Sequence, residues 1–184
     1  MVNREYFIKK NEQVSPNKLQ ADKSIPDESW IEHNKGEILV CQDAFLLYKE
    51  GILLAERLNF PVKNSFFPIG GGMINGSFEE GSLRKIVKEV SNLEITNIQN
   101  IGFVKILFER DLFDKNKKRD IFSKVYYAEA EGELKLDKFH NEHKIIPITD
   151  CKKYDSPIDN TLFNNLHPYV QDFLQIACQR AMGL

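Results

Sequence analysis

The sequence predicts one α/β domain in which helices cover both faces of a mixed β-sheet. The apolar run at residues 37–47 is too continuous for a half-exposed strand and indicates a strand covered on both faces, and residues 95–107 and 121–130 are two further long strand candidates. Residues 79–91 and 161–182 instead carry apolar side chains at helix spacing. A sheet buried on both faces needs a cover on each side, and these two amphipathic segments can supply it.

The first half of the sheet is predicted as a hairpin. Residues 37–47 form a nearly unbroken apolar strand, and the segment Lys49-Glu50-Gly51 then predicts a tight turn. Residues 52–58 are therefore expected to be the antiparallel partner strand.

The second half of the sheet is predicted from two longer strands at residues 95–107 and 121–130, which a charged loop at 109–120 joins. Residues 145–148 predict one more short strand. The last helix is expected to begin near Pro168, because proline is tolerated in the first turn of a helix.

The N-terminal residues 1–34 are polar and mixed, and we expect them to form an arm outside the main domain of residues 35–184. A short helix near residues 4–10 is the alternative to a plain arm. A second short helix is expected at residues 26–31, where a proline takes the first position and Trp30 contacts the domain.

Composition and charge argue against several classes of function. The 184 residues are 42% hydrophobic and 28% charged, and a net charge of -2 gives no electrostatic reason to expect nucleic acid binding. No apolar run approaches the roughly 20 residues of a membrane span, and the N-terminus lacks a signal-peptide core. The three cysteines are far apart and odd in number, which favours a reducing, cytoplasmic setting over a disulfide framework or zinc site.

A glycine-rich segment precedes the helix predicted at residues 79–91. Residues 66–72 read Phe-Phe-Pro-Ile-Gly-Gly-Gly, and glycines ahead of a helix let backbone N–H groups approach an anion closely. A plain glycine turn is the alternative.

The longer stretch of sequence around these glycines, from the strand at 52–58 through the helix to residue 95, resembles the Nudix superfamily. The resemblance covers about residues 37–148 and implies a Nudix-like α/β/α sandwich with a mixed β-sheet and a long C-terminal helix.

The Nudix box reads G-x5-E-x7-R-E-U-x-E-E-x-G-U, where U is aliphatic, and this sequence departs from it at most charged positions. Without gaps, the box begins at Gly71 and ends at Leu93. At the box positions for Glu, Arg, Glu, Glu, Glu and Gly between them, the sequence has, in that order, Ser77, Lys85, Ile86, Glu89, Val90 and Asn92. A one-residue slip would recover Arg84 but would place a polar residue at the last aliphatic position, so we prefer the ungapped frame.

The missing carboxylates change what the resemblance implies about a metal. Positions 86 and 90 lie one turn apart on one helix face, where two carboxylates would converge on Mg²⁺ or Mn²⁺ beside a diphosphate. Ile86 and Val90 occupy that face here, which leaves Glu89 and the Gly71 carbonyl as candidate metal ligands. A surface ion pair between Glu89 and Lys85 is the alternative.

Within the superfamily, the pattern is most similar to the GDP-mannose mannosyl hydrolases, which also have an altered box. Asp43 and Arg57 fall where that group carries an Asp and a diphosphate-binding Arg. The resemblance implies Arg57, Gly70, Gly71 and Gly72 as substrate contacts. A carboxylate inside an apolar strand is costly to bury unless it is paired, so a purely structural pairing of Asp43 is the alternative.

That group also takes its general base from a histidine in a late loop. Here His140 and His143 lie in a segment expected to be a loop, and either could act as a base near neutral pH or bind a metal. We therefore predict Asp43, His140 and His143 as candidate catalytic residues. An exposed polar loop without a function is the alternative.

Two functions remain open from the sequence. One is a Nudix-type hydrolase of a nucleoside diphosphate linked to another moiety, with a sugar nucleotide favoured, which would use Mg²⁺ or Mn²⁺. The other is an inactive Nudix-like module that binds a nucleotide-type ligand or a protein partner. In both, the expected ligand is a small nucleotide diphosphate derivative, and a homodimer is an open option for the assembly.

Overall fold

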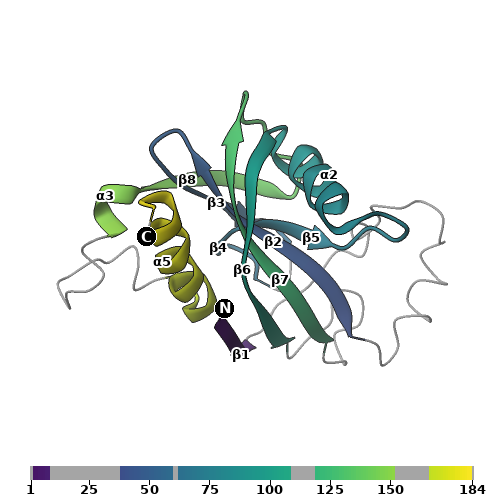
Figure 1. Cartoon of the computed structure of the whole chain (residues 1–184). Coiled ribbons are helices and arrows are strands. Elements are labelled where there is room, and N and C mark those ends of the chain that lie inside the picture. Colours follow the sequence, from purple (N-terminus) through teal and green to yellow (C-terminus); the bar gives the residue numbers. More distant parts are fainter. Residues whose placement is uncertain (1, 9–37, 60–61, 109–118, 152–165, 184) are drawn as a thin grey trace.

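A mixed β-sheet with helices on both sides forms the domain, as the computed structural model shows (Figure 1). This arrangement confirms the predicted α/β class. The structure describes residues 2–8, 38–59, 62–108, 119–151 and 166–183. Among these residues, no helix is long and apolar enough to cross a membrane.

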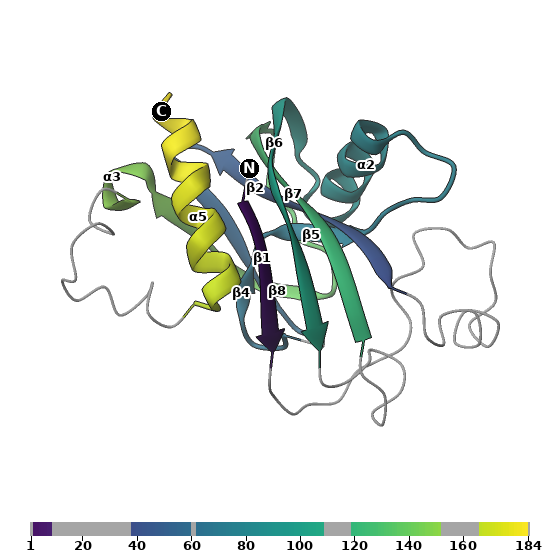
Figure 2. The same cartoon turned by 60° about the horizontal axis from the view of Figure 1, so that its bottom comes forward.

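Within the described residues, eight strands make up the sheet. They are β1 (Val2–Ile8), β2 (Leu39–Tyr48), β3 (Gly51–Arg57), β4 (Phe66–Phe67), β5 (Ile69–Gly72), β6 (Glu94–Phe108), β7 (Arg119–Glu131) and β8 (His140–Pro147). The order is β1-β6-β7-β2-β3-β4, while β5 pairs with β2 and β8 pairs with β3. The β1–β6 and β2–β7 pairs are parallel, and Figure 2 shows β1, β6 and β7 side by side. The helices are α2 (Glu79–Ser91), α3 (Ile148–Cys151) and α5 (Pro168–Ala181).

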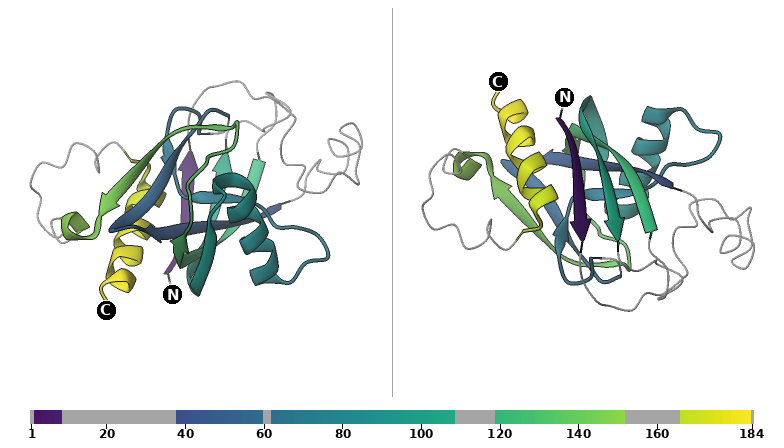
Figure 3. Two further views of the ribbon diagram at one scale, coloured as in Figure 1. Left: turned by 90° about the horizontal axis from the view of Figure 1, so that it is seen from above. Right: turned by 90° about the horizontal axis from the view of Figure 1, so that it is seen from below.

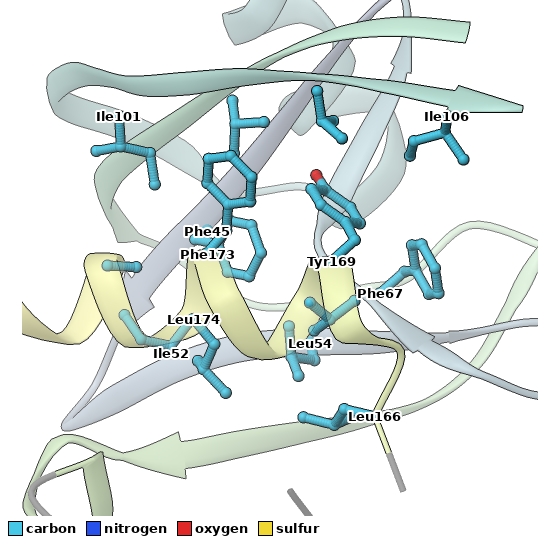
Figure 4. Close-up of a cluster of buried hydrophobic side chains, with 14 of the residues drawn as sticks. Phe45, Ile52, Leu54, Phe67, Ile101, Ile106, Leu166, Tyr169, Phe173 and Leu174 are labelled. Carbon is cyan, nitrogen blue, oxygen red and sulfur yellow. The ribbon is translucent and has the colours of Figure 1, made fainter. Parts of the chain in front are cut away.

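The sheet separates two hydrophobic cores, one under α5 and one under α2, which lie on opposite sides of the strands (Figure 3). Side chains of β2 alternate between them, because successive residues of a strand point to opposite faces. Cys41 and Phe45 belong to the α5 side, and Ala44 and Leu46 belong to the α2 side. The α5 side is rich in aromatic and branched side chains (Figure 4). By this alternation, Asp43 belongs to the α5 face.

Helix α2 has the predicted bounds and is tied to the sheet at its first residue. Glu79 accepts hydrogen bonds from Tyr126 and Lys124, and its backbone oxygen accepts one from the Gln42 amide at 2.9 Å. Hydrogen bonds from Lys124 and Tyr126 lower the pKa of Glu79. At the other end, Asn92 adopts the left-handed conformation with φ 61°, which is the cap expected for a residue replacing the box glycine.

Three expectations about local structure were wrong. Residues 4–8 are not helical, because Val2–Ile8 is a strand that pairs in parallel with β6. His140 and His143 lie in β8 and not in a loop, since that strand begins at His140. Cys178 is disulfide-bonded, whereas the odd cysteine count had argued against a disulfide framework.

Some predictions fall outside the described residues. They are the helix at residues 26–31 with Trp30, most of the loop at 109–120, and the first residues of the segment 161–182.

Candidate functional site

Asp43 is a half-buried carboxylate on the α5 face of β2. Its Oδ2 atom accepts hydrogen bonds from Ser123 Oγ at 2.7 Å and from Tyr169 Oη at 2.8 Å. Burial raises the pKa of Asp43, while these two hydrogen bonds and the nearby charge of Arg57 act in the opposite direction. The carboxylate therefore has the polar partners that a buried acid requires.

The other carboxylate oxygen, Asp43 Oδ1, accepts no hydrogen bond from the described residues. Among those residues, Gln42 Oε1 is the only fully buried side-chain polar atom without a partner, so Asp43 Oδ1 remains accessible to solvent. Gly70 is the partner of Asp43 in the β2–β5 register. A Cβ atom at Gly70 would lie 2.1 Å from Asp43 Oδ1, so glycine is what leaves room for this oxygen.

Arg57 ends β3 and brings a guanidinium group toward Asp43. Asn59 Oδ1 accepts from both Nε and one terminal nitrogen of Arg57 at 3.3 Å. Burial lowers the pKa of Arg57, and the negative charge of Asp43 counteracts this effect. The other N–H groups of Arg57 have no partner within the described part of the chain, which leaves them able to bind a phosphate.

His140 lies beside Arg57, since the two are partners in the β3–β8 register. Its Nδ1 atom is 2.7 Å from Asp137 Oδ1, and its side chain is only 9% exposed. The same Asp137 oxygen accepts from the Phe139 N–H at 2.9 Å, so the carboxylate acts as acceptor and Nδ1 carries the proton. When the ring is neutral, this tautomer leaves Nε2 as an acceptor, which is what a general base needs.

The loop that contains Asp137 is fixed to the C-terminal end of α2. The N–H of Asp137 donates to Val90 O at 2.9 Å, and the N–H of Lys135 donates to Ser91 O at 3.0 Å. These bonds satisfy carbonyl groups that a helix end leaves unpaired. They also bring the Asp137–His140 pair close to the last turn of α2, which contains Glu89.

Solved structures of known proteins share this arrangement of strands and helices. A NUDIX-family hydrolase from Clostridium perfringens superposes with a TM-score of 0.57, at 16% identity, over 79% of this chain and 99% of its own. The chain has the Nudix fold. The NUDIX domain of Shewanella oneidensis NrtR, solved with ADP ribose, gives a TM-score of 0.54 at 16% identity and covers 79% and 89% of the two chains.

Sequence comparison adds one relative to the Nudix-fold structures. The low-salt glycan biosynthesis protein Agl8 of Haloferax volcanii is 27% identical over 164 residues, which are 84% of this chain and 94% of Agl8. No protein-family model matches the chain.

The carboxylates of this Nudix fold do not form a ready-made metal cluster. Within the described ranges, no group of three His, Cys, Asp or Glu residues is placed to hold a metal ion. Ile86 is buried, and a Cβ atom at Gly71 would lie 3.4 Å from its Cγ2 atom, so this helix face packs against the glycine strand. Glu89 is exposed and forms no ion pair with Lys85 or any other described residue. The donors fit only a cation that phosphate oxygens help to bind.

The structure brings four of the predicted site residues together and shows three more residues that contact them. Asp43, Arg57, Gly70 and His140 are neighbours through the β2–β5 and β3–β8 pairings and through charge interactions. The residues missed from the sequence are Ser123, Tyr169 and Asp137. His143 is exposed in β8, opposite Ala55, and unlike His140 it has no carboxylate partner among the described residues.

His167 is expected to make the stability of the domain depend on pH. Its ring Nδ1 accepts from the Tyr169 N–H at 3.2 Å as the cap of α5, and burial lowers its pKa to about 4. Below the ordinary pKa of about 6.5 the unfolded chain binds a proton that the folded chain excludes. Stability should therefore be complete above pH 6.5 and fall by up to about 3 kcal/mol as the pH drops to 4.

Urea unfolding at pH 7, 5.5 and 4 measures this effect. His167→Asn keeps a good capping side chain but cannot titrate, so its stability should decline less over the same interval. Parallel decline of the two proteins would contradict the role of His167.

Proposed function

We propose that this chain is a Nudix-type hydrolase of a nucleoside diphosphate linked to another moiety, with a sugar nucleotide as the favoured substrate. The observation that carries the proposal is the placement of Arg57 beside both the Asp43 carboxylate and the Asp137–His140 pair. An arginine with unused N–H groups, an accessible carboxylate oxygen and a histidine oriented by a carboxylate are the groups that hydrolysis of a diphosphate ester needs.

Each group has a distinct role in the proposed reaction. Arg57 binds the diphosphate through its unused N–H groups and neutralises charge that develops there. His140 accepts a proton from the attacking water at Nε2, and Asp137 holds the ring in that tautomer. Asp43 accepts a hydrogen bond from the ligand at Oδ1. The backbone of Gly70, Gly71 and Gly72 lies along the ligand, in keeping with the resemblance to GDP-mannose mannosyl hydrolases.

Glu89 and the Gly71 carbonyl would hold a Mg²⁺ or Mn²⁺ ion that also contacts the diphosphate. Such ions are commonly bound through one or two carboxylates together with substrate phosphates, which matches the exposed and unpaired Glu89. When bound, the metal would neutralise phosphate charge. Glu89 is next to Val90, whose carbonyl accepts from Asp137, and this supports a metal close to the proposed base.

The comparisons support the choice of ligand class. A Nudix-fold neighbour was solved with ADP ribose, a nucleoside diphosphate joined to a sugar. Agl8 is described by its role in glycan biosynthesis, a process built on sugar chemistry. Both are consistent with a sugar nucleotide as the substrate of this chain.

A second function, binding without turnover, is favoured by the missing carboxylates. Ile86 and Val90 occupy the positions where two metal-binding glutamates of the box would lie, and the described residues hold no preformed cluster. In that case the same groups would recognise a nucleotide-type ligand or a protein partner.

Turnover of a panel of sugar nucleotides and ADP ribose, with Mg²⁺ or Mn²⁺, separates these functions. We expect the wild-type protein to hydrolyse at least one ligand and Glu89→Gln to reduce kcat/KM roughly 100-fold, since a metal contributes several kcal/mol to such a reaction. Glu80→Gln, on the same helix and exposed, is the matched control and should change kcat/KM less than three-fold.

The other outcomes are equally informative. Full activity in Glu89→Gln would refute the metal assignment. A ligand-induced rise in Tm without turnover would favour the binding module. Neither turnover nor a rise in Tm would contradict both functions.

A further inference from the structure

Tyr169 connects the C-terminal helix to the candidate site. It lies in the first turn of α5, is fully buried, and packs its ring against Phe45, Phe67 and Phe173 at centroid distances of 6.2, 5.9 and 5.4 Å. Figure 4 shows the ring extending from α5 with its hydroxyl directed away from the helix. That hydroxyl donates to Asp43 Oδ2 at 2.8 Å. The aromatic packing thus fixes where the hydrogen bond is made.

Ser123 reaches the same carboxylate oxygen from β7. It is fully buried, and its Oγ donates to Asp43 Oδ2 at 2.7 Å. Two rigidly held O–H donors on one oxygen restrict rotation of the carboxylate, because turning it would leave both donors unpaired. The second oxygen, Oδ1, is then held beside Gly70 and accessible to solvent.

The groups around Asp43 come from four elements. They are Arg57 of β3, Gly70 of β5, Ser123 of β7 and Tyr169 of α5. Arg57 acts on Asp43 only through charge, without a direct ion pair among the described residues, so the two hydroxyl groups are what orient the carboxylate. Such supporting contacts determine how exactly a ligand-binding group is placed.

We propose that Tyr169 is a positioning residue that holds Asp43 Oδ1 toward the ligand bound by Arg57, so that α5 forms part of the functional site. This inference rests on the proposed function, because it requires that Asp43 contact a ligand. It goes beyond that function by assigning a role to a helix that otherwise only covers the sheet.

A double-mutant cycle tests the proposal. Tyr169→Phe, Asp43→Ala and the double variant are compared for kcat/KM, or for affinity where turnover is absent, with the best ligand of the panel. We expect Tyr169→Phe to lower the value roughly ten-fold, as for a hydrogen bond to a charged group, and less than two-fold when Asp43 is already Ala. Tyr127→Phe is the control, because Tyr127 is buried in the same core and does not bond Asp43.

Several results would overturn the proposal. One is an equal loss of kcat/KM, or of affinity, when Tyr169→Phe is made in the wild-type protein and in Asp43→Ala, since the tyrosine would then act only by packing. Another is no loss of kcat/KM or affinity in Tyr169→Phe. A wild-type protein that binds none of the ligands removes the positioning role together with the proposed function. The free energy of unfolding of the same variants distinguishes these cases. A coupling energy between Tyr169 and Asp43 in that measurement reports their hydrogen bond without any ligand.

Discussion

Replacing His140 with Asn should lower kcat for the best sugar nucleotide by roughly 100- to 10,000-fold, the usual contribution of a general base. Asn retains an N–H group near the position of Nδ1, so it can still donate to Asp137 Oδ1, which lies 2.7 Å from the native ring nitrogen. It lacks the acceptor at Nε2. The loss should therefore fall on the chemical step, with little change in KM, and steady-state kinetics measures both.

His143→Asn provides the comparison within the same strand. His143 is exposed and lies opposite Ala55, and no described carboxylate orients it, so we expect a loss below three-fold. Equal losses in the two variants would show that the Asp137–His140 pair is not the base.

Replacing Gly70 with Ala should destabilise the domain by about 2–3 kcal/mol, the upper part of the range found for overpacking a well-packed site. The new Cβ would lie 2.1 Å from Asp43 Oδ1 and 2.7 Å from the backbone oxygen of Gln42. The carboxylate can turn away only by losing its bonds to Ser123 and Tyr169, and the Gln42 oxygen belongs to the β2 backbone. Thermal unfolding should show a Tm lower by roughly 4–12 °C.

Gly71→Ala is the matched control one residue along the same strand. Its Cβ would lie 3.4 Å from the nearest atom, Ile86 Cγ2, which is an ordinary contact, so the change in stability should stay within about 0.5 kcal/mol. If the two variants unfold at the same temperature, close packing of Gly70 against Asp43 is not what makes glycine necessary there.

The sequence predicted best those elements whose hydrophobic pattern is complete within the element. Helix α2 begins and ends where its apolar stripe and Asn92 indicated, and Pro168 begins α5 as expected. The β2–β3 hairpin also follows its turn residues. These features depend on neighbours within a few positions, so periodicity and caps are sufficient to find them.

The strands that were missed depend on distant partners. Val2–Ile8 alternates poorly in polarity, and it becomes a strand by pairing in parallel with β6, about a hundred residues later. β8 pairs only with β3 among the described strands. The first half of β8 is polar and has no alternation of buried and exposed side chains. Edge strands of this kind give a weak signal in hydrophobic periodicity.

Of the candidate site, the sequence predicted Gly70 and the titratable members Asp43, Arg57 and His140. Asp43 and Arg57 were noticed because a charge in or beside an apolar strand requires an explanation, whereas Ser123 and Tyr169 are ordinary residues of a strand and a helix. Their bonds to Asp43 span 80 and 126 residues of sequence. Asp137 gave a local signal, three residues before His140, that could have been used.

The loop between β7 and β8 is attached at both ends to elements that define the fold. Tyr48 donates to Gly132 O, the N–H groups of Lys135 and Asp137 donate to the end of α2, and the Leu58 N–H donates to Phe139 O. Its length is therefore constrained. Inserting or deleting one residue here would shift the Asp137–His140 pair relative to Arg57, so homologues with a different spacing should differ in the chemistry of the site.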